Sequence, residues 1–173
     1  MKQKIINVLF WSMLIVYAVL VLDLFFRPID LFNPQRDPFG GFQLVPFHSI
    51  VEYLKMGGGR AMRNLAGNVV VFIPFGIYLY LLQTDKRVGK NLLLIAATSL
   101  AVELLQALLR VGVTDIDDVL LNTLGGFIGI LFCLLLHRVC KNEVREKTIV
   151  TILSAIVGIP VAFLSLVTFF YNL

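Results

Sequence analysis

Three carboxylates fall within four residues of the stretch TDIDDVLLNTLGG, residues 114–126: Asp115, Asp117 and Asp118. They lead directly into an apolar segment that carries Asn122 and then two glycines. Asp118 and Asn122 are four residues apart, so in a helix they stack on one face. Carboxylates so placed can engage cations, amines or hydroxyl groups, or exchange protons. We therefore take Asp117, Asp118 and Asn122 as candidate site residues.

A second polar set lies upstream, where Glu103, Gln106 and Arg110 are spaced i, i+3, i+7 and share one helix face. Glu103 lies about 10 Å deeper than Arg110 at 1.5 Å of rise per residue. An ionisable group at such depth in a membrane costs roughly 2.5–3.5 kcal/mol, so Glu103 should face the protein interior and have a partner. The alternative is a hydrogen-bond network that only fastens helices together.

The sequence TDID also fits a capping box, with Thr114 as the N-cap and Asp117 at the third helical position. The positive end of a helix dipole favours carboxylates nearby. Capping explains one or two of the carboxylates, and Asp115 is explained as well by a cap or surface charge as by a role in a site. It requires neither a third carboxylate nor Asn122.

Two further kinds of chemistry are open to these acids. Two carboxylates of different burial can share acid and base roles in an intramembrane enzyme that acts on an envelope lipid. Against an enzyme, the sequence has no Ser or Cys nucleophile near a His, no HExxH motif and no phosphate-type glycine loop. No cofactor is predicted, although carboxylates also suit a divalent cation. The ligands of such a cation would be Glu103, Asp115, Asp117 and Asp118.

Composition places all of these residues in a membrane. Of the 173 residues, 58% are hydrophobic and 15% are charged, against about 45–50% and about 25% in soluble domains. The length allows a single membrane domain over residues 1–173. The net charge of +4 reflects Lys and Arg at span ends and not a nucleic-acid surface.

Five stretches are apolar enough to cross a bilayer, which needs about 20 residues per helix. They are 5–26, 65–83, 91–109, 118–137 and 148–170. The second carries Asn68 and Pro74, and the proline removes a helical hydrogen bond and kinks the helix. The expected fold is therefore an all-α polytopic membrane helix bundle with about five transmembrane helices.

Two local patterns predict how these spans are arranged. Gly125 and Gly129 form a G-x-x-x-G pattern that lets another helix approach closely, either 65–83 or 91–109. Within 46–56, Phe47, Ile50, Val51 and Leu54 recur at the helix period and predict a short amphipathic helix on the outer leaflet. Cys133 and Cys140 are too far apart along one helix for a mutual disulfide.

Loop charges predict the orientation. The loops 84–90 and 138–147 carry seven Lys and Arg together, whereas the loop 110–117 carries one. Basic residues concentrate on the cytoplasmic side, so the N-terminus is expected inside and the C-terminus outside. The polar residues of three spans then gather at the outer side.

Four motifs in this order resemble the VanZ-like family of bacterial membrane proteins, over residues 42–137: FQLVPFHSI, GNVVVFIPFG, ELLQALLR and TDIDDVLLNTLGGFIG. The spans 5–26 and 148–170 flank that core. The family typically has an Asn before the first PF, where this chain has Gln43, Leu44 and Val45 ahead of Pro46. The motif positions are Asn68, Pro74, Glu103, Gln106, Arg110, Asp117, Asp118, Asn122 and Gly125.

The resemblance implies a bacterial plasma-membrane protein associated with resistance to teicoplanin and related lipoglycopeptide antibiotics, with no catalytic assignment. The leading hypothesis is a non-enzymatic envelope protein whose outer polar pocket binds a lipid-linked or amphiphilic ligand. In it, Arg110 would pair with an anionic group. A purely structural or assembly subunit is a further alternative. The lipid bilayer is the expected surrounding, with no nucleic-acid partner.

Overall fold

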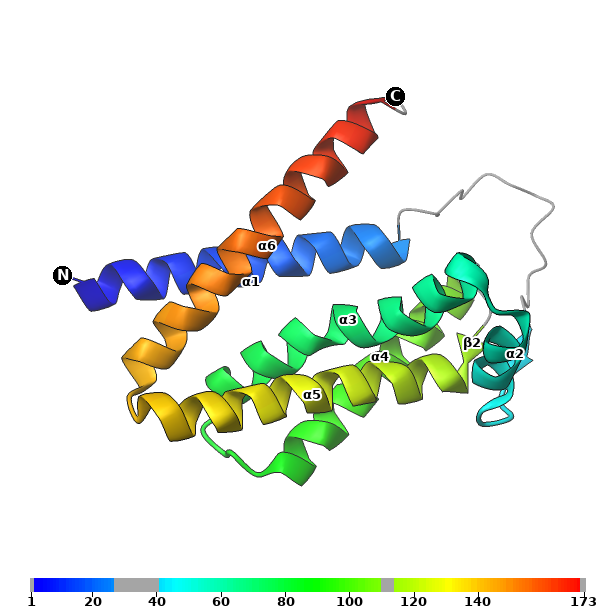
Figure 1. Cartoon of the computed structure of the whole chain (residues 1–173), viewed down its shortest axis with the longest axis horizontal. Helices are drawn as coiled ribbons and strands as arrows, with labels where there is room; N and C mark the ends of the chain where they lie inside the picture. The colour runs from blue at the N-terminus through cyan, green and yellow to red at the C-terminus, as the bar shows by residue number, and fades with distance from the viewer. Residues whose placement is uncertain (1, 27–40, 110–113, 172–173) are drawn as a thin grey trace. The chain divides into compact units, whose positions relative to one another are not determined.

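The computed structural model of the chain describes residues 2–26, 41–109 and 114–171 (Figure 1). These ranges contain six α-helices and two strands of two residues each. In chain order they are α1 (Lys2–Phe26), β1 (Phe42–Gln43), α2 (His48–Met56), α3 (Gly58–Leu82), α4 (Val88–Leu108), β2 (Thr114–Asp115), α5 (Ile116–Cys140) and α6 (Glu143–Tyr171).

Within the described residues, five helices are long and apolar enough to cross a membrane. They are α1, α3, α4, α5 and α6, and each overlaps one of the spans predicted from the sequence, with α3 and α4 ending one residue before the predicted spans do. Large apolar side chains are exposed along all five, for instance Ile15, Leu93 and Phe163. Such surfaces are stable in lipid and costly in water. The predicted all-α polytopic membrane fold is confirmed.

The chain divides into two compact units. One comprises Phe25–Leu131, and the other comprises Met1–Leu24 together with Phe132–Leu173. All of the polar residues singled out between positions 68 and 122 belong to the first unit.

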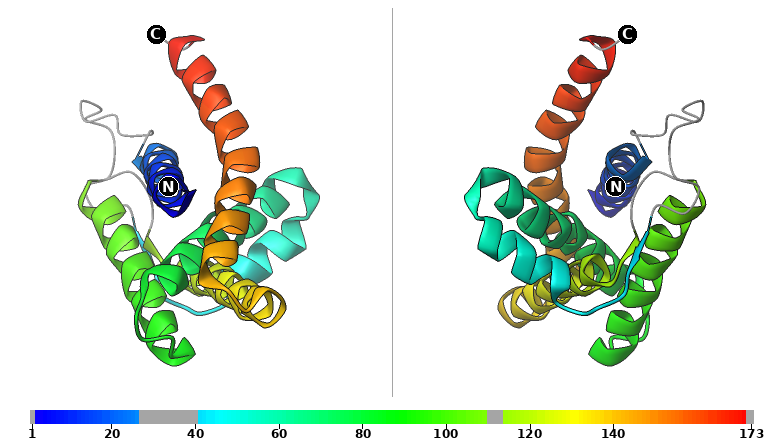
Figure 2. Two further views of the ribbon diagram at one scale, coloured as in Figure 1. Left: turned by 90° about the vertical axis from the view of Figure 1, so that its left-hand side faces the viewer. Right: turned by 90° about the vertical axis from the view of Figure 1, so that its right-hand side faces the viewer.

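In the first unit α3, α4 and the part of α5 up to Leu131 run side by side (Figures 1 and 2). The helix α2 and the strand β2 lie at the end where α3 and α5 begin and α4 ends (Figure 1). The link between α3 and α4 has only five residues, so the chain reverses direction there and α4 packs antiparallel to α3.

Glycines set the distance between α3 and α5. A Cβ atom on Gly125 would lie 2.1 Å from the backbone oxygen of Val69, and one on Gly129 would lie 2.2 Å from that of Ile73. Any side chain at these positions would collide with backbone. Of the two partners expected for the G-x-x-x-G pattern, the structure selects α3. The helix α3 runs without interruption through Pro74.

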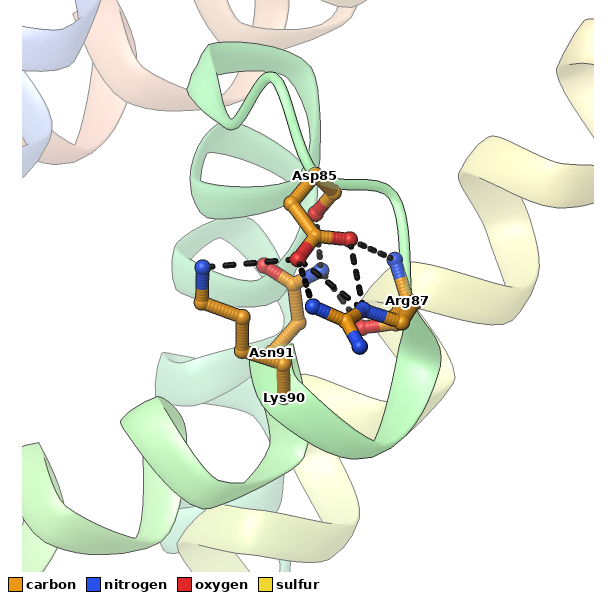
Figure 3. A network of polar contacts seen from close by, with 4 residues as sticks. All are labelled: Asp85, Arg87, Lys90 and Asn91. Carbon is orange, nitrogen blue, oxygen red and sulfur yellow. Dashed lines mark hydrogen bonds and ion pairs between the residues drawn. The ribbon is translucent and has the colours of Figure 1, made fainter.

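The connection between α3 and α4 is held by one carboxylate (Figure 3). The Arg87 guanidinium bonds Asp85 through Nε at 3.0 Å and through Nη2 at 2.7 Å, and Lys90 Nζ lies 3.4 Å away. The Arg87 side chain holds the pKa of the Asp85 carboxyl well below its usual range. The buried Asn91 side chain donates from Nδ2 to the backbone oxygen of Arg87 at 2.9 Å, which secures the first turn of α4.

In the second unit α5 ends at Cys140 and α6 begins at Glu143. The turn is secured by a 2.7 Å contact between His137 Nδ1 and the buried Glu146. Ser165 Oγ of α6 donates to Asp23 of α1 at 2.7 Å. Cys133 and Cys140 form no disulfide with each other.

Candidate functional site

Asp117 fastens α2 to the start of α5. Its side chain is 1% exposed, and its two carboxylate oxygens accept the backbone N–H groups of Phe47 at 2.5 Å and Ile50 at 3.1 Å. The first N–H groups of a helix lack partners within that helix, and α2 has no cap from its own flanking residue. Asp117 therefore caps α2, although it lies 70 positions after Phe47 and 67 positions after Ile50 in the chain.

This contact also supports an unusual backbone. Phe47 adopts a left-handed conformation, with φ of 65°. Bulky residues rarely adopt this region, because the Cβ atom approaches the backbone too closely. The bond from its N–H to Asp117 helps to hold the conformation. At the other end of α2, Gly57 has φ of 59°, which permits the abrupt turn into α3 without such a penalty.

The capping box predicted for TDID is wrong in its assignments. Asp115 caps α5, because its Oδ1 accepts the backbone N–H of Asp117 at 2.9 Å. Thr114 lies instead in β2, and its Oγ donates to the backbone oxygen of Glu103 at 3.4 Å. The prediction failed because α5 begins at Ile116, one residue later than a Thr114 cap requires, so the residue at the cap position is Asp115.

A short parallel pairing, absent from the sequence prediction, joins the two connections at this end. Phe42 pairs with Thr114 and Gln43 with Asp115. The Gln43 amide also donates to His48 Nδ1 at 2.8 Å. Two-residue strands have no periodic pattern, so the sequence carried no signal for them. Their effect is to tie the segment before α2 to the acidic stretch before α5.

Glu103 joins this arrangement from α4. Its side chain is 3% exposed, and its Oε2 accepts the backbone N–H of Asp115 at 3.3 Å. The carboxyl groups of Glu103 and Asp118 are also close enough to interact electrostatically. Asp118 in turn accepts a short hydrogen bond from the Asn68 amide of α3. Three spans thus contribute to one group of polar side chains.

Deeper along the same helix faces, Asn122 meets a residue that the sequence reading had missed. Its Nδ2 donates to Ser99 Oγ at 2.8 Å, and both side chains are buried. Ser99 is one turn from Glu103 and Asn122 is one turn from Asp118, so the i, i+4 spacing would have identified Ser99. Among the described residues Asn122 Oδ1 has no hydrogen-bond partner. An unpaired buried acceptor costs about 1–3 kcal/mol.

One predicted residue of α4 makes its hydrogen bond elsewhere. Gln106 Nε2 donates to the backbone oxygen of Phe25 at 3.3 Å and not to one of the acids. Arg110 lies outside the residues that the structure describes. We call the remaining set the acid–amide cluster. It consists of Asn68, Ser99, Glu103, Asp115, Asp117, Asp118 and Asn122.

The cluster does not offer a set of metal ligands. Among the described residues no three His, Cys, Asp or Glu side chains are arranged to hold a metal ion. The carboxylate of Asp117 is already committed to two backbone N–H groups. In the part of the chain that the structure describes, the four acids considered as divalent-cation ligands are therefore not arranged around a common metal position. These acids are Glu103, Asp115, Asp117 and Asp118.

Beside the cluster, the segment 42–56 exposes an apolar surface. The helix α2, predicted at 46–56, spans His48–Met56 and has no fully buried residue. Ile50 packs against the protein, whereas Val51, Leu54 and Met56 are exposed. The exposed apolar residues of the whole segment are Phe42, Leu44, Val45, Phe47, Val51, Leu54 and Met56.

Fold and cluster together define a polytopic membrane protein with buried acids and amides at one end of a three-helix core. Comparison with known proteins narrows this class. The chain belongs to the VanZ/LLP1 family, whose model matches residues 9–137. It is also similar to "Protein VanZ" of Enterococcus faecium, with 34% identity over 90 residues that cover 51% of this chain and 55% of that protein.

The chain thus spans about half the length of the curated relative that it matches. No solved structure matches it.

Proposed function

We propose that this protein binds a lipid-linked or amphiphilic ligand at the acid–amide cluster, on the outer side of the bacterial plasma membrane. In this role it contributes to resistance against lipoglycopeptide antibiotics of the teicoplanin type. The observation that carries the proposal is the placement of a largely buried polar cluster directly beside the exposed apolar segment 42–56. A ligand with a polar head and an acyl chain matches both features at once.

The hydrogen bonds support different roles for the acids and amides at this end of the protein. Asp115 and Asp117 hold α5 and α2 in place. Glu103, Asp118 and Asn122 lie next to them and supply polar groups to a ligand head. The exposed apolar side chains of α2 accompany the acyl chain in the outer leaflet. Arg110, which follows α4, is proposed to pair with an anionic group of the ligand.

The test is antibiotic susceptibility, together with the amount of fluorescent teicoplanin bound to the cell surface. Cells expressing Glu103→Gln or Asp118→Asn are expected to lose the protection that the wild-type chain provides. Asp85→Asn is the matched control, because it changes a partly exposed acid at the opposite end of α3 and α4. Wild-type protection by both cluster variants at normal expression would remove the cluster from the function.

A further inference from the structure

The side chain of Asn122 has a fixed orientation and an unused acceptor. Its Nδ2 donates to Ser99 Oγ at 2.8 Å, so its Oδ1 is turned away from that hydroxyl. The side chain is 1% exposed, and Oδ1 is without a partner among the described residues. Side chains of a helix lean toward its N-terminus, onto the preceding turn. The preceding turn of α5 carries Asp118, so the Asn122 amide leans toward the carboxylates.

The groups around this acceptor are also acceptors. Carboxylates and amide oxygens accept hydrogen bonds and donate none. Glu103 and Asp118 lie close enough to interact electrostatically, and Asn68 supplies a single donor, to Asp118. None of the salt bridges between described residues involves Glu103 or Asp118. Among the described residues, the side chains of the cluster therefore offer more hydrogen-bond acceptors than donors.

We propose that the acid–amide cluster binds a primary ammonium group, with Asn122 Oδ1, Glu103 and Asp118 as its acceptors. This rests on the proposed function, because it names the polar part of that ligand. An ammonium group is compact, positively charged and has three N–H donors, which matches three acceptors from two helices. A neutral hydroxyl would supply one donor and no charge. A divalent metal would need a ligand set that these residues do not form.

Two carriers can present this group at the outer end of the spans. One is an aminophospholipid headgroup, and the other is the amine of a soluble amphiphile. Both share the same chemistry and both have an acyl chain to lay along the exposed side chains of segment 42–56.

The first experiment uses the full-length chain in nanodiscs of phosphatidylcholine and phosphatidylglycerol, which contain no primary ammonium. Methylammonium is titrated while the side-chain ¹⁵N–H signal of Asn122 and the unfolding temperature are followed. We expect a saturable change of both. Tetramethylammonium has the same charge and no N–H donor. Its affinity should therefore be lower by a factor of roughly ten or more. Equal responses to the two cations, or none to methylammonium, would overturn the proposal.

The second experiment compares the two buried asparagines whose Oδ1 is unpaired among the described residues. Asn122→Leu should weaken methylammonium binding by roughly tenfold, the loss of one hydrogen bond to a charged donor. Asn91→Leu is the matched control, because Asn91 lies at the opposite end of α4 and should leave the affinity unchanged. A folded Asn122→Leu protein with wild-type affinity contradicts the proposal, and the wild-type titration decides it if that variant does not fold.

Nanodisc composition identifies the carrier. With phosphatidylethanolamine in the nanodiscs, a weaker apparent affinity for methylammonium supports the lipid headgroup, and an unchanged affinity supports the soluble amine. Susceptibility tests keep the two proposals apart. Lost protection in Asp118→Asn cells without methylammonium binding in vitro would leave the proposed function standing and refute the ammonium site. Methylammonium binding in vitro, with no effect of the cluster variants on susceptibility, would support the ammonium site and refute the proposed role in resistance.

Discussion

The four carboxyl groups at the start of α5 and the end of α4 have different structural roles. Asp115 and Asp117 satisfy the N-termini of α5 and α2. Asp118 accepts a bond from the Asn68 amide, and Glu103 accepts one from the backbone N–H of Asp115 in β2. The sequence could nominate these acids, because ionisable groups in a membrane need partners. It could not tell which helix end each acid caps, because the partner of Asp117 lies in a segment distant in the chain.

Asp117→Ala should loosen the first turn of α2. Losing a capping acceptor costs typically about 1 kcal/mol, which corresponds to a roughly fivefold loss of amide protection. Hydrogen exchange of the Phe47 and Ile50 amides in nanodiscs measures this. Asp117→Asn keeps one acceptor oxygen and should give an intermediate value. Unchanged exchange at both amides in the alanine variant would show that another group caps α2.

The bond between Asn68 and Asp118 is expected to stabilise the packing of α3 against α5. A double-mutant cycle with Asn68→Ala and Asp118→Ala should give a coupling of about 1 kcal/mol, since side-chain hydrogen bonds in membranes average about 0.6 kcal/mol and reach about 1.7 kcal/mol. The free energy of unfolding in mixed micelles is the measured quantity. Strictly additive effects of the two substitutions would mean that the bond contributes nothing to stability.

At the scale of elements, long apolar runs predicted every span, because a bilayer fixes both helix length and composition. Helix ends were less predictable: α3 begins at Gly58, although three consecutive glycines indicate a flexible joint. Glycine disfavours a helix by about 1 kcal/mol relative to alanine. Gly58 has φ of 81°, which glycine adopts without strain, so these glycines form the turn from α2 into α3, and no apolar pattern marks that turn.

The close approach of α3 and α5 gives a prediction with an internal control. Gly125→Ala places a methyl group 2.1 Å from a backbone oxygen of Val69, which cannot move without shifting the helix. Overpacking of this kind costs about 1–3 kcal/mol. Gly67→Ala, also within a helix of this core, meets nothing within 4 Å and should be neutral or slightly stabilising. Thermal unfolding of both variants in the same detergent compares them, and equal unfolding temperatures would exclude a tight α3–α5 contact.

At the scale of the whole molecule, the family match covers residues 9–137, so it includes the unit Phe25–Leu131 and reaches into the other. The acid–amide cluster lies entirely within that first unit. Helix α6 lies beyond the matched residues and carries Pro160 within an apolar helix whose exposed side chains suit lipid. The function proposed for this chain therefore depends on the first unit and on the side of the membrane that its cluster faces.

The charges of the loops predict which side of the membrane the cluster faces, and labelling tests this prediction directly. Lys86, Arg87 and Lys90 lie at the end of the core opposite to the cluster. Basic residues are retained in the cytoplasm, so α2 should lie outside. In a chain carrying Cys133→Ala and Cys140→Ser, Glu52→Cys on exposed α2 should react with a membrane-impermeant maleimide in intact cells. Glu143→Cys, exposed at the start of α6, should react only after permeabilisation. The reverse pattern would place the cluster in the cytosol, where no extracellular antibiotic or outer-leaflet lipid could reach it.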